Sequence, residues 1–254
     1  MGPIKDYPLL VFAITLLVLW LSELAGAYIL KRRAAAAEVR EDVNIIQGAI
    51  LTLLGLLIGF SFAMAVSRYD LRKTYEEAEA NAIGTEYVRA GLLPAAERDA
   101  ARALLHQYLD KRLQFYTARD AGRLQAIDTE TAALQQQMWA VVERSAVAQP
   151  NVIVAMAAAG MNDVLNSEGY TQSAWWNRIP RAAWVLMLLV AVCCNVMVGY
   201  GVRKAEAEPM LMAVLPLVVA TSFMLIADID SPRGGLIRVD PHNLLRLAVS
   251  LQVR

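Results

Sequence analysis

The residues that could take part in chemistry are few, and the most unusual of them is an acid inside an apolar run. Glu23 lies in "LWLSELAGAY", about eight residues before the basic end of a membrane-length segment. An ionisable group at that depth is costly and usually faces protein or water. Two interpretations stay open: a pore-lining or proton-sensitive acid, or a carboxylate that tilts toward the headgroups or bonds Ser22 and a neighbouring helix.

A second acidic motif, "ADIDSPRGGLIRV", follows the last apolar segment. Asp228 and Asp230 could hold a cation or form, with Arg233, the charged mouth of a pore. They could equally pair with Arg233 or Arg238 while the two glycines turn the chain. Calcium loops need more oxygen ligands at fixed positions than this motif supplies, so we expect no metal site.

The remaining reactive residue types do not form a catalytic pattern. Cys193 and Cys194 are adjacent inside an apolar segment, and His106 and His242 are far apart without a partner motif. There is no phosphate-binding glycine loop and no triad-like set of residues. We therefore expect neither an enzyme nor a cofactor. The formal net charge of +0 gives no general attraction to nucleic acid.

The composition indicates a membrane protein. Hydrophobic residues make up 57% of the chain and charged residues 19%. The excess is concentrated in four windows, Pro8–Leu30, Ile45–Val66, Ala182–Val202 and Met210–Ala227. Each is close to the roughly 20 residues that a helix needs to cross a bilayer. The fourth window is the shortest and contains Pro216.

The second window has small residues at helical spacing. Gly48, Thr52, Gly55 and Gly59 fall on one face, because they are separated by four, three and four residues. Small residues let helix backbones approach closely in lipid. This stripe is therefore either a packing surface or the wall of a narrow pore where several subunits meet.

The same window carries bulky apolar residues that could form a gate. Leu56, Phe60 and Met64 share a face, and Phe62 follows in "GFSF". Rings of such side chains can stop ions by dewetting a constriction. The same residues could also face lipid.

A polar helical stretch, about residues 67–180, separates the second and third windows. We expect the second helix to continue to about Arg89, with Glu86 and Arg89 as an i,i+3 ion pair. Further breaks are predicted at 91–94, 120–122 and 149–150. The predicted apolar stripes are Ala101, Leu105, Leu109, Leu113 and Tyr116; Leu124, Ile127, Leu134, Met138 and Val141; and Ile153, Ala157, Met161 and Val164.

The sequence thus predicts an all-α protein with four transmembrane helices and a soluble helical bundle inserted between the second and third. The expected parts are residues 1–66 (transmembrane helices 1 and 2), 67–179 (bundle), 180–228 (transmembrane helices 3 and 4) and 229–254. The last part is a turn followed by an amphipathic helix at about Pro241–Val253.

Three motifs resemble the bestrophin-like domain family of bacterial membrane proteins, itself distantly similar to bestrophin channels. They are "LLGLLIGFSFAMAVSRYDLRK", "EANAIGTEYVRAGLL" and "DIDSPRGGLIRV". The resemblance implies a homo-oligomer around an axis, for which a pentamer is one form, with the second helix lining an ion path. It carries over Phe60 and Phe62 to the apolar neck. The acidic calcium clasp of eukaryotic bestrophins has no clear match.

We accordingly expect an oligomeric ion channel of the bacterial inner (plasma) membrane, with lipid, ions and further copies of itself as partners. The alternative is a non-conducting membrane-anchored sensor or scaffold whose helical domain binds a partner. The positive-inside rule is divided. The basic residues that flank the first helix favour an N-terminus outside the cell membrane. The total count of basic residues on each side favours a cytoplasmic N-terminus, which also places the helical bundle in the cytoplasm. The short loops carry Lys31, Arg32, Arg33, Arg40, Arg203 and Lys204.

Overall fold

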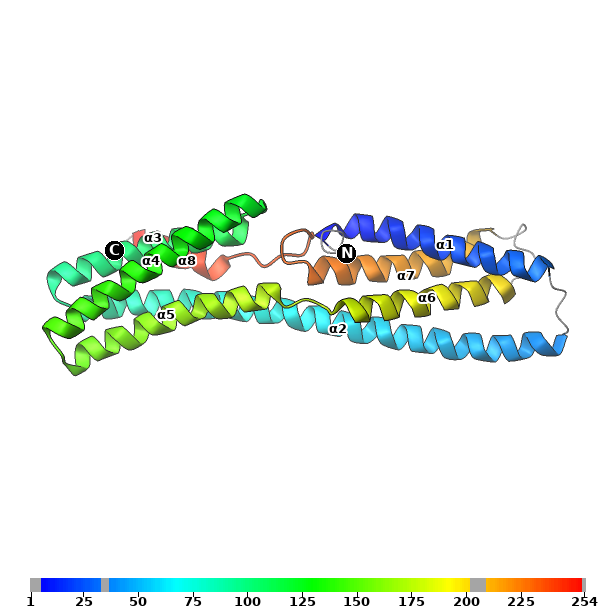
Figure 1. Ribbon diagram of the computed structural model, residues 1–254, viewed down its shortest axis with the longest axis horizontal. Helices are drawn as coiled ribbons and strands as arrows, with labels where there is room; N and C mark the ends of the chain where they lie inside the picture. The colour runs from blue at the N-terminus through cyan, green and yellow to red at the C-terminus, as the bar shows by residue number, and fades with distance from the viewer. Residues whose placement is uncertain (1–5, 33–36, 202–208, 253–254) are drawn as a thin grey trace. The chain divides into compact units, whose positions relative to one another are not determined.

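The computed structural model describes residues 6–32, 37–201 and 209–252, which are largely helical (Figure 1). The loop residues Arg33, Arg203 and Lys204, and Val202 at the end of the third window, lie outside these ranges. The helices are α1 (Pro8–Arg32), α2 (Ala37–Arg89), the 3-10 turn η2 (Ala90–Leu92), α3 (Ala95–Thr117), α4 (Ala121–Ala148), α5 (Val152–Trp176), α6 (Arg181–Gly201), α7 (Pro209–Asp230) and α8 (His242–Gln252). No strand occurs in the described ranges.

The chain divides into two compact units. Unit 1 comprises Met1–Tyr69 and Arg178–Arg238, and unit 2 comprises Asp70–Asn177 and Val239–Arg254. Each unit is built from two separate stretches of sequence, and α2 contributes residues to both.

The prediction that the second apolar helix continues to Arg89 is confirmed, because α2 is a single helix of 53 residues. Its end has a local cause. After η2, Leu93 is extended with φ −78° and ψ 159°. The residue before a proline disfavours the helical region, and Pro94 follows.

Four helical stretches of the described residues are long and apolar enough to cross a membrane. The candidate stretches are Pro8–Ile29, Ile45–Leu92, Val152–Gly201 and Met212–Asp230. The second and third are far longer than one crossing needs. Their apolar parts are about residues 45–66 of α2 and 182–201 of α6, and these we treat as the spans.

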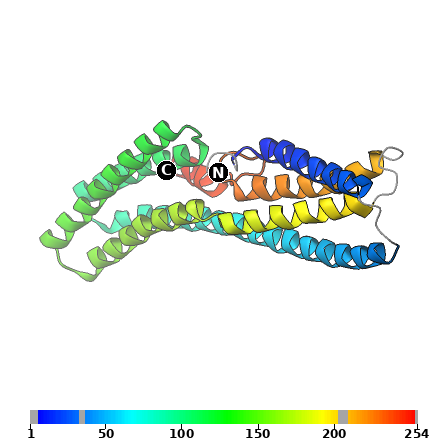
Figure 2. The same ribbon diagram turned by 45° about the vertical axis from the view of Figure 1, so that its right-hand side comes forward.

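Helices α1, α6 and α7 contact one another in unit 1 (Figure 2), and α1 packs against α6 at two glycines. A Cβ atom added to Gly26 would collide with the Val196 carbonyl oxygen, and one added to Gly199 would collide with that of Glu23. Two backbones are therefore in direct contact here, which is the use of small residues in a bilayer. The apolar core of unit 1 includes Leu19, Met187 and Phe223.

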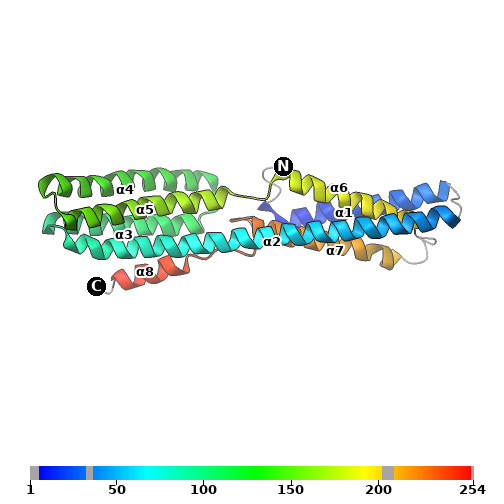
Figure 3. The same cartoon turned by 90° about the horizontal axis from the view of Figure 1, so that it is seen from below.

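Unit 2 is formed by the C-terminal part of α2 with α3, α4, α5 and α8 (Figure 3). The predicted helix breaks are confirmed. The side chain of Asp120 accepts a hydrogen bond from the Arg123 N–H (2.8 Å) at the start of α4, and Asn151 accepts one from the Val154 N–H (3.0 Å) at the start of α5. Such N-caps satisfy backbone donors at a helix start.

Most of the predicted stripes face the interior of unit 2. Ala101, Leu105, Leu109, Met138, Met161 and Val164 are buried. Ile153 is the exception: its side chain is exposed, and Val154 is buried in its place. The prediction of Ile153 was wrong because the first turn of a helix can start at either of two adjacent apolar residues, and the sequence alone does not fix the phase. The predicted C-terminal amphipathic helix is confirmed as α8.

Candidate functional site

Packing within the chain leaves much of the outer surface of α2 in unit 1 open. Only a narrow strip of this helix packs against the rest of the chain, and in that strip Leu54, Ser61 and Ala65 are buried. These residues are seven and four apart, so they lie on one face. Much of the remaining circumference of residues 45–64 is exposed apolar surface.

The predicted gate residues lie on this open surface. Leu56 is 53% exposed and Phe60 63%, while Phe62 and Met64 are each 38% exposed. Successive residues of an α-helix turn by about 100°, so Leu56, Phe60 and Met64 share a face within about 80°. Phe62 is about 200° from Phe60 on the same basis. The four residues therefore do not form one face, and Phe60 and Phe62 cannot both point to one axis.

The predicted glycine stripe is also open. A Cβ atom added to Gly48, Gly55 or Gly59 would meet nothing within 4 Å, and the hydroxyl of Thr52 donates to the Gly48 carbonyl (2.9 Å). The stripe therefore packs against no other described residue of this chain. By helical geometry its centre lies about 110° around α2 from the Leu56–Phe60–Met64 face. The helix thus presents two distinct outer faces, one smooth and one bulky.

Glu23 lies inside unit 1 and not on its outer surface. It is 1% exposed, and neither carboxylate oxygen has a hydrogen-bond partner among the described residues. Its backbone is in contact with Gly199 of α6. The predicted bond with Ser22 is not formed, since that hydroxyl donates to the Val18 carbonyl (2.7 Å).

The oxygens of the acidic motif are used by backbone donors. The carboxylate of Asp228 accepts from the N–H groups of Leu236 (2.7 Å) and Ile237 (2.9 Å). That of Asp230 accepts from the Ile179 N–H (3.0 Å) and lies 4.0 Å from an Arg68 guanidinium nitrogen. The two aspartates thus hold the turn after α7 and the start of α6 in place.

The glycines of this motif allow close approach. A Cβ atom added to Gly234 would collide with the Asp6 carbonyl oxygen, and one added to Gly235 would lie 2.6 Å from the Asp228 carboxylate. Arg238 donates to the Gly235 carbonyl (2.6 Å). Among the residues that the structure describes, no group of three or more His, Cys, Asp or Glu side chains could hold a metal ion.

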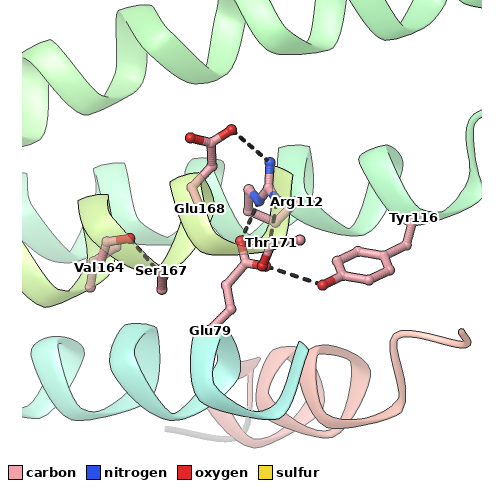
Figure 4. A network of polar contacts seen from close by, with 7 residues as sticks. All are labelled: Glu79, Arg112, Tyr116, Val164, Ser167, Glu168 and Thr171. Carbon is pink, nitrogen blue, oxygen red and sulfur yellow. Dashed lines mark hydrogen bonds and ion pairs between the residues drawn. The ribbon is translucent and has the colours of Figure 1, made fainter. Parts of the chain in front are cut away.

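A buried polar network in unit 2 was not predicted from the sequence (Figure 4). The carboxylate of Glu79 on α2 accepts hydrogen bonds from the Arg112 guanidinium, the Tyr116 hydroxyl (3.3 Å) and the Thr171 hydroxyl (3.1 Å). Arg112 also lies 3.6 Å from Glu168. The side chains of Glu79 and Arg112 are both fully buried. The network therefore ties α2 to α3 and α5.

Burial and charge shift the ionisation of this network. Burial alone would lower the pKa of Arg112, but the adjacent Glu79 carboxylate outweighs it and the pKa is raised, so the guanidinium stays charged. Burial raises the pKa of Tyr116, and Glu79 raises it further. The sequence did contain a signal: Arg112 falls between Leu109 and Tyr116 on a stripe that is otherwise apolar.

The predicted ion pair of Glu86 with Arg89 is replaced by another. Arg89 lies 3.9 Å from Asp163 of α5, while both carboxylate oxygens of Glu86 are buried and accept no hydrogen bond from the described residues. An i,i+3 pair is weak, and tertiary contact with α5 decides the side-chain direction here.

A comparison with family models gives a match over most of the chain. The model described as "Bestrophin-like domain" matches residues 10–244. The chain belongs to the bestrophin-like family. The resemblance inferred from the three motifs is thereby confirmed. None of the curated proteins compared with the chain is similar enough to count as a relative.

Solved structures share the fold of this bestrophin-like chain. One variant of a bacterial bestrophin homologue from Klebsiella pneumoniae has a TM-score of 0.67 at 10% identity, covering 96% of this chain and 97% of that chain. Another structure of that homologue has a TM-score of 0.64 at 12% identity, covering 93% and 98%. The likeness in fold extends over both units, although few residues are shared.

Proposed function

We propose that this bestrophin-like protein is an oligomeric membrane ion channel in which α2 lines the conduction path. The observation that carries the proposal is the outer surface of α2: an apolar helix of membrane length that packs on its own chain through one narrow strip only. In a monomer, lipid would have to cover the glycine stripe, which offers little surface for dispersion contacts. In a ring of subunits, one outer face of α2 could line the central axis and the other could contact the adjacent subunit.

The two faces of α2 suit two different neighbours. The face of Leu56, Phe60 and Met64 would point to the axis and form a stack of apolar rings, which control ions by dewetting. The face of Gly48, Gly55 and Gly59 would lie against the adjacent subunit, where small residues allow close approach. Phe62 is on the side of the glycine stripe and is assigned to the subunit contact.

The membrane arrangement follows from the spans. Helices α1, α6, α7 and residues 45–66 of α2 would cross the bilayer. Unit 2 would form the water-facing helical domain inserted between the second and third spans, with α8 joining it from the C-terminal side. We propose the bacterial inner membrane, a cytoplasmic unit 2 and a pentamer as one form of the ring. Because backbone donors occupy Asp228 and Asp230, we propose no ion-binding role for them at the pore mouth.

Conductance in planar bilayers tests this function. Purified wild type should conduct ions, and Phe60→Ala should increase conductance because the constriction loses its widest side chain. Phe62→Ala is the matched control, an aromatic on the opposite face. The native mass of the detergent-solubilised protein would be measured first. A monomeric protein, or wild type and Phe60→Ala that both fail to conduct any ion, would overturn the proposal.

The alternative function, a non-conducting sensor or scaffold, is favoured by one observation. Unit 2 contains a polar cavity of about 670 Å³ between α2 and α8. That volume is within the range of small-molecule sites. A channel and a sensor are separated by the conductance assay, while the cavity can be tested by binding in either case.

A further inference from the structure

The cavity in unit 2 has a composition that selects its ligand. Its walls are two helix faces: residues 80, 81, 84, 85, 88 and 89 of α2, and residues 243, 246, 247 and 250 of α8. The charged lining residues are Arg89 and Arg246, and no carboxylate is among the lining residues. Asn81, Thr85, Asn243 and Ser250 add amide and hydroxyl groups. Guanidinium groups bind carboxylate and phosphate through paired hydrogen bonds.

The absence of acids from this lining is notable because α2 is rich in glutamate nearby. Glu76 instead accepts from the N–H groups of Asn243 (2.9 Å) and Leu244 (3.0 Å), and from the Asn243 amide (2.7 Å). Glu79 is held by Arg112 in the buried network. These two carboxylates are therefore used for structure and do not neutralise the arginines of the cavity.

Glu86 and Asp163 are acids close to the lining residue Arg89. Glu86 is buried against α5, where a Cβ atom added to Gly160 would collide with its carboxylate. Burial raises the pKa of Glu86 to about 8, against the opposing effect of Arg89 and with a smaller contribution from Asp163. At neutral pH it is largely uncharged, so it does not cancel the charge of Arg89. Asp163 does so only partly, at 3.9 Å and with its own side chain mostly exposed.

Arg246 is the residue best placed to respond to a ligand. It is exposed, and among the described residues it makes no hydrogen bond or ion pair. The cap that Glu76 forms on the first turn of α8 fixes this helix against α2. The α8 side of the cavity is therefore held in place without a ligand, and the Arg246 guanidinium remains available to bind one.

We propose that the cavity between α2 and α8 binds a small organic anion that carries carboxylate or phosphate groups. The ligand would place its oxyanion groups against Arg89 and Arg246, and its carbon skeleton against Val88 and Leu247. Since α2 lines the proposed ion path in its first half and this cavity in its second, the bound anion would act as an effector. The binding itself does not depend on conduction.

Ligand-induced thermal stabilisation and calorimetry of the full-length protein test the site. The probes are glutarate and glycerol 3-phosphate, with glycerol as the neutral match. We expect at least one anionic probe to raise the midpoint of unfolding and to bind, and glycerol to do neither. Arg246→Gln should weaken binding by about tenfold or more, because it removes a charge-assisted contact. Arg144→Gln, an exposed arginine of α4 outside the lining, should bind like wild type.

A further probe distinguishes a lipid from a soluble metabolite as the source of the anion. Dihexanoyl phosphatidic acid carries the same headgroup as glycerol 3-phosphate. Tighter binding of this ester would support a phosphate site filled by lipid, and equal binding a site for soluble anions. The proposal is overturned if no anionic probe binds wild type, or if Arg246→Gln binds them equally well. It is also overturned if Arg246→Gln dissociates the oligomer while no probe binds, because the cavity would then be a subunit contact.

Discussion

Removing Arg112 should be among the most damaging single substitutions in unit 2. Its guanidinium and the Glu79 carboxylate are both fully buried, and Arg112→Met would leave that carboxylate with the hydroxyls of Tyr116 (3.3 Å) and Thr171 (3.1 Å) alone. Breaking a buried ion pair from one side typically costs about 3–5 kcal/mol. For a chain of this size, each 1 kcal/mol corresponds to a shift of roughly 2–4 °C in the unfolding midpoint. We therefore expect a midpoint lower by about 6–20 °C.

The assay is thermal unfolding of the detergent-solubilised protein, followed by circular dichroism. The matched control is Arg98→Met on the same helix, because Arg98 is only half-buried and pairs with its neighbour Asp99. That change should leave the midpoint unaltered. The double substitution Glu79→Leu with Arg112→Met should recover much of the loss, because it removes both charges. If Arg112→Met unfolds within 2 °C of wild type, on the same scale, the assignment of a dry, paired charge is wrong.

Three further predictions concern packing, titration and the turn after α7. Gly199→Ala should lower the unfolding midpoint, because the added Cβ would collide with the Glu23 backbone. Gly55→Ala should leave the midpoint of a monomer unchanged, because a Cβ added there meets no atom of the described residues within 4 Å. If Gly55→Leu dissociates the oligomer, the subunit contact lies at the glycine stripe. Glu86→Gln should stabilise the protein progressively as the pH rises from about 5 to about 8, and the gain should then level off. Between these values the folded acid, with a pKa of about 8, keeps a proton that the unfolded chain releases, so wild type loses stability over this range. A midpoint difference independent of pH would contradict that. Asp228→Ala should destabilise unit 1 by leaving the N–H groups of Leu236 and Ile237 unsatisfied, and unchanged melting would count against it.

The sequence predicted the elements well because their signals are local. Apolar length marked the four candidate spans. The predicted breaks at 91–94, 120–122 and 149–150 lie at or beside helix ends in the structure. Composition and spacing also placed the glycine stripe and the Phe60 face on α2.

The partners of polar side chains were harder to predict because tertiary contacts set them. The Glu79–Arg112 pair joins residues 33 apart on different helices, and no i,i+3 or i,i+4 rule could find it. Asp228 could be recognised as an unusual acid, but its actual partners, backbone N–H groups eight and nine residues later, depend on the path of a turn. The cavity of Arg89 and Arg246 depends on α8 returning to α2 from the far end of the chain.

That return of α8 also sets an order in which the molecule can be completed during synthesis. Within unit 2 the ribosome makes residues 70–177 before α6 and α7, and makes α8, the helix that Glu76 caps, last. At about 5–20 residues per second, the delay is several seconds. During that interval unit 2 lacks α8 while α6 and α7 are still being made. The last helix therefore closes unit 2, and a nascent chain without it would expose the Glu76 carboxylate and the part of α3 that α8 contacts to any chaperone or protease nearby.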